Sequence, residues 1–196
     1  MKFDPWRHYL RGLLFEILKR PQPAIEAYRE ALRADPDFAQ AAKCLAYLHA
    51  ARHEHEQAAG YYLHVLRLKP GDAESWFNLG FIRDQAHDKP AAIEAFREAA
   101  RLKPTLDRAW YGMGMAHATL GQHEEAATAL ARAAELQPMN GHAWYALGMA
   151  YHHCRQPGKV KEVVHHLLRF DPVMTRRLIQ EAERADLAHL VQDLAV

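Results

Sequence analysis

Cysteine is almost absent from this 196-residue sequence, which contains only Cys44 and Cys154. Two cysteines provide no disulfide framework and favour a reducing compartment. Serine occurs once, at Ser75, outside the strand-turn-helix motif in which a hydrolase holds its nucleophile. No glycine-rich phosphate-binding loop is present either. We therefore expect no catalytic residues, no cofactor and no enzyme activity.

A strong charge of either sign is also missing. The sequence has 25 Lys and Arg residues against 24 Asp and Glu residues, a net charge of +1, which indicates neither a nucleic-acid partner nor an anionic membrane. No stretch reaches the roughly 18 apolar residues of a membrane-spanning helix. The N-terminal segment "MKFDPWRHYLRGLLFEILKR" lacks the cleavage site of a signal peptide. These features predict a cytoplasmic protein.

The alternation of apolar and polar residues that is typical of strands is lacking, and a period of 34 residues occurs in its place. Four sets of residues recur at this period. The prolines are Pro36, Pro70, Pro104, Pro138 and Pro172. The small residues are Gly12, Ala46, Gly80, Gly114 and Gly148. A second small set comprises Ala24, Ala58, Ala92, Ala126 and finally Val160. A bulky set comprises Tyr28, Tyr62, Phe96, Leu130 and Val164.

Each period predicts two helices. In residues 73–106, "AESWFNLGFIRDQA" has apolar residues at helical spacing, and "HDK" interrupts it. The second segment, "PAAIEAFREAARLK", begins with Pro90 in a first-turn position and ends before Pro104. The small residue of the first helix, Gly80 in this period, is expected to let the second helix approach closely.

The repeat resembles the tetratricopeptide repeat (TPR) family. The matching residues are Trp76, Leu79, Gly80, Ala92, Phe96, Ala99 and Pro104, and they recur as Trp110, Met113, Gly114, Ala126, Leu130, Ala133 and Pro138. The resemblance implies an all-α, right-handed superhelical solenoid of five helix-turn-helix units. These units are 5–38, 39–72, 73–106, 107–140 and 141–174.

Residues 175–196 do not continue the repeat and form a further amphipathic segment, with an apolar stripe that includes Leu178, Leu187 and Leu194. We expect this segment to be a helix, interrupted near Asp186, that caps the open end of the stack. A helix that binds a partner is the alternative interpretation.

The resemblance also implies that the first helix of every unit lines a concave groove. The residue after the tryptophan position then faces the groove, and these residues are Tyr9, Lys43, Phe77, Tyr111 and Tyr145. The residue four positions later also faces the groove, and these residues are Leu13, Tyr47, Phe81, Met115 and Met149. His152 lies one turn further on in the last unit.

All five residues of the second set are apolar or aromatic, which predicts an apolar stripe along the groove. An exposed apolar patch usually marks an interaction site, and Met and aromatic residues are enriched at such sites. We therefore expect a partner peptide or helix to bind there. The alternative is that these side chains pack on one another or are covered by the N-terminal Trp6.

Some TPR proteins bind the acidic C-terminal tails of chaperones through a carboxylate clamp. Lys43, Asn78 and Arg108 fall at matching positions, but Tyr47 and Gly112 replace the first Asn and the last cation of the clamp. We therefore do not expect this ligand, although Lys43 and Arg108 are candidates for pairing with one acidic group of an otherwise apolar partner.

The fourteen histidines raise the question of a metal site, because His53 and His55 are close in sequence and "HHC" places His152 and His153 beside Cys154. Zinc needs three or four ligands that converge on one point. The histidines recur in inter-helix turns or lie on different helices, so we expect no metal site.

Taken together, these patterns predict a protein-interaction module that acts as an adaptor, scaffold or assembly chaperone. Two alternatives remain open. One is a scaffold that assembles with copies of itself, and the other is a non-catalytic accessory subunit of an enzyme.

Overall fold

The computed structural model describes residues 4–192, which form eleven α-helices and one 3-10 helix and contain no strand. The all-α repeat fold that the sequence predicts is thereby confirmed. The chain packs as two compact units, Met1–Leu102 and Lys103–Val196.

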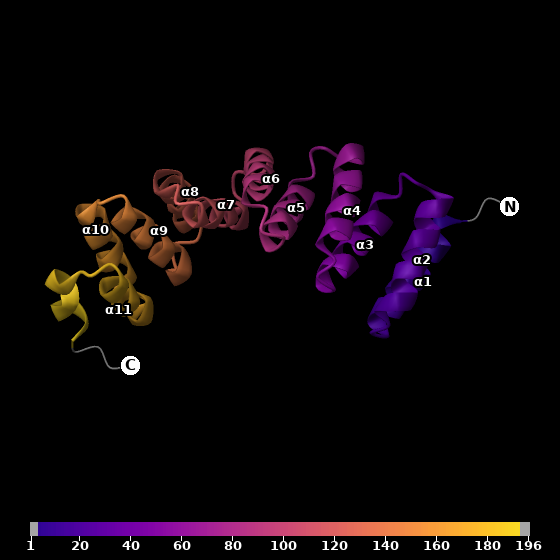
Figure 1. The fold of residues 1–196 in the computed structure, drawn as a ribbon. Helices are drawn as coiled ribbons and strands as arrows, with labels where there is room; N and C mark the ends of the chain where they lie inside the picture. The colour runs from indigo at the N-terminus through magenta and orange to yellow at the C-terminus, as the bar shows by residue number, and fades with distance from the viewer. Residues whose placement is uncertain (1–3, 193–196) are drawn as a thin grey trace. The chain divides into compact units, whose positions relative to one another are not determined.

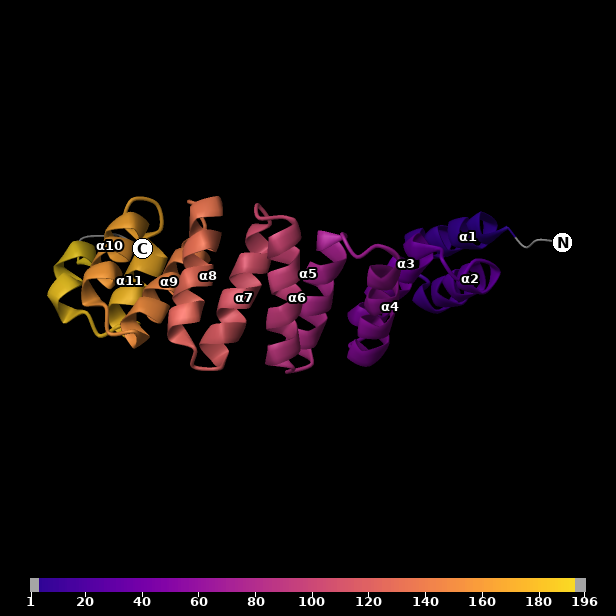
Figure 2. The same ribbon diagram turned by 90° about the horizontal axis from the view of Figure 1, so that it is seen from above.

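Unit 1 consists of three helix pairs (Figures 1 and 2). Within each pair the two helices pack against each other, and the second helix of the first two pairs also packs against the first helix of the following pair. We call the first helix of a pair the inner helix and the second the outer helix. The pairs are α1 (Pro5–Ile17) with α2 (Pro21–Ala34), α3 (Ala39–Ala51) with α4 (His55–Leu68), and α5 (Ala73–Gln85) with α6 (Lys89–Leu102).

Unit 2 contains two further pairs and two C-terminal elements. The pairs are α7 (Asp107–Thr119) with α8 (His123–Leu136), and α9 (Gly141–His153) with α10 (Pro157–Leu167). The helix α11 (Pro172–Glu181) packs against α9 and α10, and the 3-10 helix η1 (Ala185–Val191) packs against α11. None of the helices in the described part of the chain is both long and apolar enough to cross a membrane.

The helices begin where the sequence supplies caps or prolines. The side chains of Asp4, Asp72, Asn140 and Asp171 accept hydrogen bonds from backbone N–H groups in the first turns of α1, α5, α9 and α11. Proline occupies the first position of α1, α2, α10 and α11, where its missing N–H carries no cost. The second residue after the end of each inner helix has a positive φ, and these residues are Lys19, His53, His87, Gly121 and Arg155.

The small residues of the inner helices lie against bulky side chains, as the repeat predicts. A Cβ atom added at Gly80 would lie 2.7 Å from Cδ1 of Phe96, and one added at Gly114 would lie 2.6 Å from Cγ of Leu130. The last pair differs from the prediction, because the bulky neighbour of Gly148 is Leu178 of α11 rather than Val164. Leu178 therefore fills a space that a larger outer-helix residue fills in the earlier pairs.

The tryptophan side chains bind the recurring prolines through hydrogen bonds that the sequence did not indicate. The indole N–H groups of Trp76, Trp110 and Trp144 donate hydrogen bonds to the carbonyl oxygens of Pro70, Pro104 and Pro138, at 2.9, 3.0 and 2.9 Å. Each bond satisfies a loop carbonyl that follows an outer helix, and it fixes the indole ring at the start of the next inner helix.

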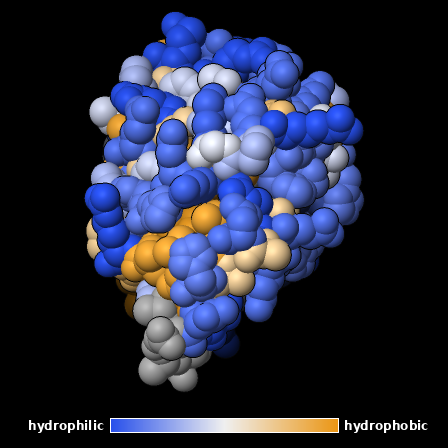
Figure 3. All heavy atoms as spheres, turned by 90° about the vertical axis from the view of Figure 1, so that its left-hand side faces the viewer, coloured by the Kyte–Doolittle hydropathy of each residue, from blue (hydrophilic) through white to orange (hydrophobic). Residues whose placement is uncertain are grey.

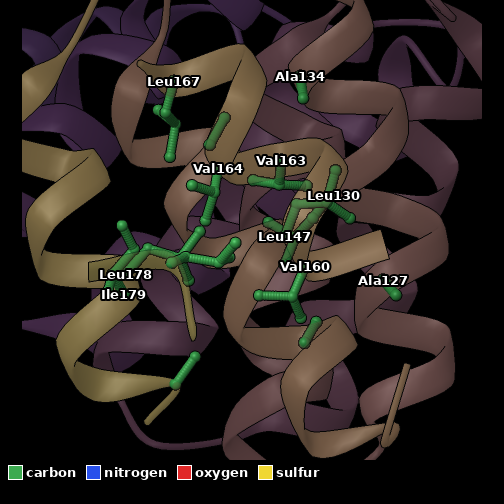
Figure 4. Packing of buried hydrophobic residues seen from close by; sticks show 14 of the residues in the cluster. Ala127, Leu130, Ala134, Leu147, Val160, Val163, Val164, Leu167, Leu178 and Ile179 are labelled. Atoms are coloured by element: carbon green, nitrogen blue, oxygen red, sulfur yellow. The ribbon is translucent and has the colours of Figure 1, made fainter. Parts of the chain in front are cut away.

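The C-terminal segment closes the core of unit 2 in two pieces. Helix α11 begins at Pro172 rather than at residue 175, and it ends before Glu183, whose φ is +53°. Leu178 and Ile179 of α11 point toward Val164 and Leu167 of α10 (Figure 4). Leu187 and Val191 of η1 are also buried, whereas the predicted stripe residue Leu194 lies outside the described residues.

Hydrophilic side chains cover most of the face seen from the side on which α10 and α11 lie in Figure 1 (Figure 3). Apolar atoms gather there in one patch. This face is consistent with a cap, since a terminal element of a repeat array needs a polar outer surface.

Candidate partner-binding surface

The inner helices of unit 1 present two large aromatic side chains to solvent. Tyr47 of α3 is 64% exposed and Phe81 of α5 is 50% exposed. They occupy equivalent positions of neighbouring pairs, 34 residues apart. Leu13, the equivalent residue of α1, is half-buried against the core that α1, α2 and α3 share. Of the second predicted groove set in unit 1, the two aromatic residues are therefore exposed to solvent and the leucine is not.

The first predicted groove set is more deeply packed. The ring of Tyr9 lies 5.7 Å from that of Tyr28 and 5.3 Å from that of Phe38. Phe77 lies 5.8 Å from Phe96 of the outer helix α6. Both residues are half-buried.

Lys43, the cationic candidate of unit 1, already has a carboxylate partner. Its ammonium forms an ion pair with Asp72, the residue that caps α5. Burial opposes ionisation of Asp72, but the hydrogen bonds from Lys43 and Ser75 prevail and lower the pKa of this carboxyl group. Asn78 lies half-buried on α5. Lys43 is therefore committed to joining α3 with the start of α5.

Two acidic groups of unit 1, one turn beyond Leu13 and Phe81, also have partners. The hydroxyl of Tyr28 donates a hydrogen bond of 2.6 Å to Glu16. Lys89 lies 2.7 Å from Asp84. Both carboxylates therefore have partners within unit 1.

Unit 2 presents a smaller open surface. Met115 of α7 is 39% exposed, Tyr111 beside it is half-buried, and burial raises the pKa of the Tyr111 hydroxyl. Arg108 lies exposed in the first turn of α7. Met149 of α9 is half-buried against the core of unit 2.

Helix α11 covers part of the surface that the sequence assigns to the groove. The hydroxyl of Tyr145 donates a hydrogen bond to Glu181, and the guanidinium of Arg177 lies 4.7 Å from the centre of the Tyr145 ring. Burial and the neighbouring Glu181 carboxylate raise the pKa of Tyr145. Tyr145 therefore holds α11 in place.

The histidines form pairs rather than a metal cage. No group of three or more potential ligands with metal-binding geometry occurs among residues 4–192. The rings of His123 and His153 stack at 4.5 Å, and His152 lies 5.2 Å from His153. Burial, followed by the nearby His123 and His152, lowers the pKa of His153. His53 and His55 lie 6.0 Å apart near the turn between α3 and α4.

The two cysteines lack the features of a nucleophile. Burial raises the pKa of the Cys44 and Cys154 thiols, so both favour the neutral form.

One exposed surface escaped the reasoning from sequence. Leu10, Leu14 and Ile17 of α1 are all more than half exposed. The sequence contained a signal for this surface, because the three apolar residues have helical spacing within α1. The resemblance to the repeat family instead directed attention to Tyr9 and Leu13.

Comparisons with known proteins agree with this architecture. Two sequence models of the tetratricopeptide repeat family match the chain, one over residues 45–107 and 111–155 and the other over residues 7–38. The first alone spans more than half of the sequence. No curated protein matches the chain.

Several solved structures have folds similar to that of this chain. The crystal structure of MamA protein has a TM-score of 0.79 and 20% identity, covering 100% of this chain and 99% of that chain. YrrB, described as a TPR protein with an unusual peptide-binding site, has a TM-score of 0.77 and 20% identity, with 90% of each chain covered. PilF of Pseudomonas aeruginosa has a TM-score of 0.71 and 18% identity, covering 95% of this chain and 87% of that chain. At these identities the likeness concerns the fold.

Proposed function

Because this chain belongs to the tetratricopeptide repeat family, a family of protein-interaction scaffolds, we propose that it binds a largely apolar peptide or helix of a partner protein on its inner helices. The single observation that carries this proposal is the exposure of Tyr47 and Phe81 at equivalent positions of α3 and α5. In this role the protein is a cytoplasmic adaptor, scaffold or assembly chaperone, and it performs no catalysis.

The proposed binding surface in unit 1 centres on Tyr47 and Phe81, with Leu13, Tyr9 and Phe77 beside them. Aromatic residues contribute a large contact area at a small entropic cost, and they are enriched among the residues that dominate binding energy. Unit 2 has an apolar surface of its own at Met115 and Tyr111, and Met adapts its shape to different partners. Tyr145, Met149 and His152 contribute only at the edge, because α11 occupies Tyr145.

The arrangement of cationic side chains on the inner helices does not favour an acidic chaperone tail as the ligand. Such a ligand needs several cationic donors that converge on its carboxylates. Lys43 is paired with Asp72, and Tyr47 and Gly112 stand where the clamp needs an amide and a cation. Asn78 and Arg108 alone do not complete that arrangement. We therefore favour a partner segment whose anchors are apolar.

The similar fold of YrrB, which is described as having an unusual peptide-binding site, supports a peptide as ligand. The net charge of +1 gives no support to nucleic acid or an anionic membrane as the partner.

The test is to select peptides from a displayed library on the intact chain and to measure the affinity of one selected peptide by fluorescence anisotropy. Combining Tyr47→Ser with Phe81→Ser should weaken binding by at least about tenfold, because aromatic anchors dominate such interfaces. Affinity should change little between about 0.05 and 0.5 M salt, since apolar contacts are not screened.

The control combines Leu63→Ser on α4 with Leu120→Ser after α7, because both leucines are exposed outside the proposed surface. This control should keep the wild-type affinity. Equal affinities for the groove variant and the wild type would refute the proposal. Light scattering over a concentration series tests the self-assembling alternative, which requires the mass to rise with concentration.

A further inference from the structure

Large apolar side chains gather on one face of α1 that no described part of the chain covers. Leu10, Leu14 and Ile17 are 59%, 52% and 78% exposed. Their spacing of three and four residues places them on the same side of the helix. Trp6 and Leu18, both more than half exposed, extend the row at its two ends. A contiguous apolar patch of this kind is unusual on the surface of a monomeric protein.

The position equivalent to Leu14 is covered by a helix in the later inner helices of unit 1. Leu48 of α3 is the counterpart of Leu14, is only 7% exposed, and packs in a cluster with Ala24, Ile25 and Tyr28 of α2. In α5 the counterpart is Ile82, which is 3% exposed and packs in a cluster with Ala58, Ala59 and Tyr62 of α4. Since α1 has the same apolar face, a helix of similar kind is the occupant that fits it.

Positive charge flanks this face at both ends. Arg7 lies one turn before Leu10, and Lys19 and Arg20 follow the end of α1. All three side chains are exposed, and none forms an ion pair with the residues between 4 and 192. The only acidic residue within α1, Glu16, accepts the hydroxyl hydrogen of Tyr28. The occupant therefore needs carboxylates at the flanks of its apolar stripe.

A second copy of the chain is a poor source of that helix. The outer helices α2 and α4 are already packed against α3 and α5. The last outer helix, α10, packs against α11, with Leu178 and Leu167 completely buried between them. Any of these three outer helices of another copy would have to leave its own core before it could cover α1.

We propose that the exposed face of α1 binds an amphipathic helix from another protein, with small apolar residues on its contact side and carboxylates at its flanks. The small residues follow from α2, which presents Ala24, Ala27 and Ala31 as buried residues on its packed side. This site adjoins Tyr9 and Leu13 on α1 but is separate from the groove anchors Tyr47 and Phe81, which lie on α3 and α5. It gives the protein two partner surfaces, one for a peptide and one for a helix.

The test uses a synthetic peptide with the sequence of residues 21–34, hydrocarbon-stapled to keep it helical and carrying Arg29→Glu and Arg33→Glu. This peptide copies the helix that covers Leu48 and adds acidic flanks. Its binding to the intact chain is measured by fluorescence anisotropy. We expect saturable binding, weakened at least about tenfold when Leu10→Ser and Leu14→Ser are combined in the chain. We also expect weaker binding of the same stapled peptide with both arginines retained.

Two control variants separate this site from the rest of the surface. Leu63→Ser with Met139→Ser removes two exposed apolar side chains elsewhere and should leave peptide binding unchanged. Tyr47→Ser with Phe81→Ser should also leave it unchanged, so the failure of this site and the failure of the groove are distinguishable.

Four results would overturn the proposal. The first is no peptide binding at millimolar concentration, and the second is binding that survives the change of Leu10 and Leu14. The third is binding of the chain to phosphatidylserine-containing vesicles, in place of the peptide, that the same variant removes. The fourth is a dimer in sedimentation experiments that this variant dissociates, because a second copy would then be the occupant.

Discussion

Gly80 and Gly60 lie within neighbouring helices of unit 1, and their surroundings are opposite. A Cβ atom at Gly80 would lie 2.7 Å from the Phe96 ring, whereas one at Gly60 would meet no atom within 4 Å. Glycine is conformationally costly within a helix by about 1 kcal/mol relative to alanine. At Gly80 the close contact with Phe96 requires glycine despite this cost. At Gly60 the surrounding space would accept a side chain.

This contrast predicts that two identical substitutions have opposite signs. Gly80→Ala should lower the free energy of unfolding by about 1–3 kcal/mol, because the core must move to accept the methyl group. Gly60→Ala should raise it by up to about 1 kcal/mol through helix propensity. Urea denaturation followed by circular dichroism measures both. A Gly80→Ala protein as stable as Gly60→Ala would show that Phe96 moves aside freely.

A second prediction at the scale of the residue concerns the carboxyl group of Asp72. Its pKa is lowered in the folded chain, so its stabilising contribution is complete above the ordinary carboxyl pKa of about 4 and is lost as the pH falls through the lower folded value. Asp72→Asn removes the ion pair with Lys43 and weakens the cap of α5. It should cost about 1 kcal/mol at neutral pH.

The measurement for Asp72 is the free energy of unfolding at pH 7, 5, 4 and 3. The difference between wild type and Asp72→Asn should shrink toward the acidic end of this series. Asp37→Asn, which changes an exposed carboxylate, serves as the control and should follow the wild type. A constant difference across the series would show that the charge of Asp72 contributes nothing.

At the scale of the element, α11 belongs to the core of unit 2. It places the fully buried Leu178 against the backbone of Gly148, and its Glu181 and Arg177 engage Tyr145. Thr175 is also fully buried, and its hydroxyl donates a 2.8 Å hydrogen bond to the carbonyl oxygen of Asp171. These contacts favour a capping role over binding of a partner by the same apolar side chains.

The capping role predicts a large effect of Leu178→Ala. Removing a buried leucine side chain typically costs about 2–5 kcal/mol, and the loss here falls on the contact between α9 and α11. Hydrogen exchange should accelerate in α9, α10 and α11. Val173→Ala on the same helix is the control, because Val173 is 55% exposed and its change should stay within about 0.5 kcal/mol. Equal exchange rates in the two variants would contradict the capping role.

At the scale of the whole molecule, stability and binding have separate sources in the same helices. Each pair buries its contacts against neighbouring helices in the chain, so the stability of a repeat protein is close to a sum of local terms. The solvent-exposed residues of the inner helices contribute little to this sum and are available to bind a partner. A net charge of +1 leaves partner choice to local patches, such as Tyr47 with Phe81, rather than to a long-range field.

The sequence by itself determined the helix pairs, their register and the small-against-bulky packing. The 34-residue period specified these features because helix formation and packing between adjacent helices depend on residues close together in the chain. Position in the repeat alone did not determine exposure, because Tyr47 and Phe81 are exposed whereas Leu13 at the equivalent position is half-buried. The start of the C-terminal helix at Pro172 was missed because the same proline had been assigned to the end of the preceding unit.

Only the tertiary structure decided which polar and aromatic groups are already occupied. Lys43 meets Asp72, Tyr145 meets Glu181, and the tryptophans meet proline carbonyls from the preceding loop. The open face of α1 emerged in the same way, since exposure depends on the absence of a covering helix. A side chain's own helix sets its direction, but its availability depends on what the neighbouring elements place against it, and periodicity carries no information about that.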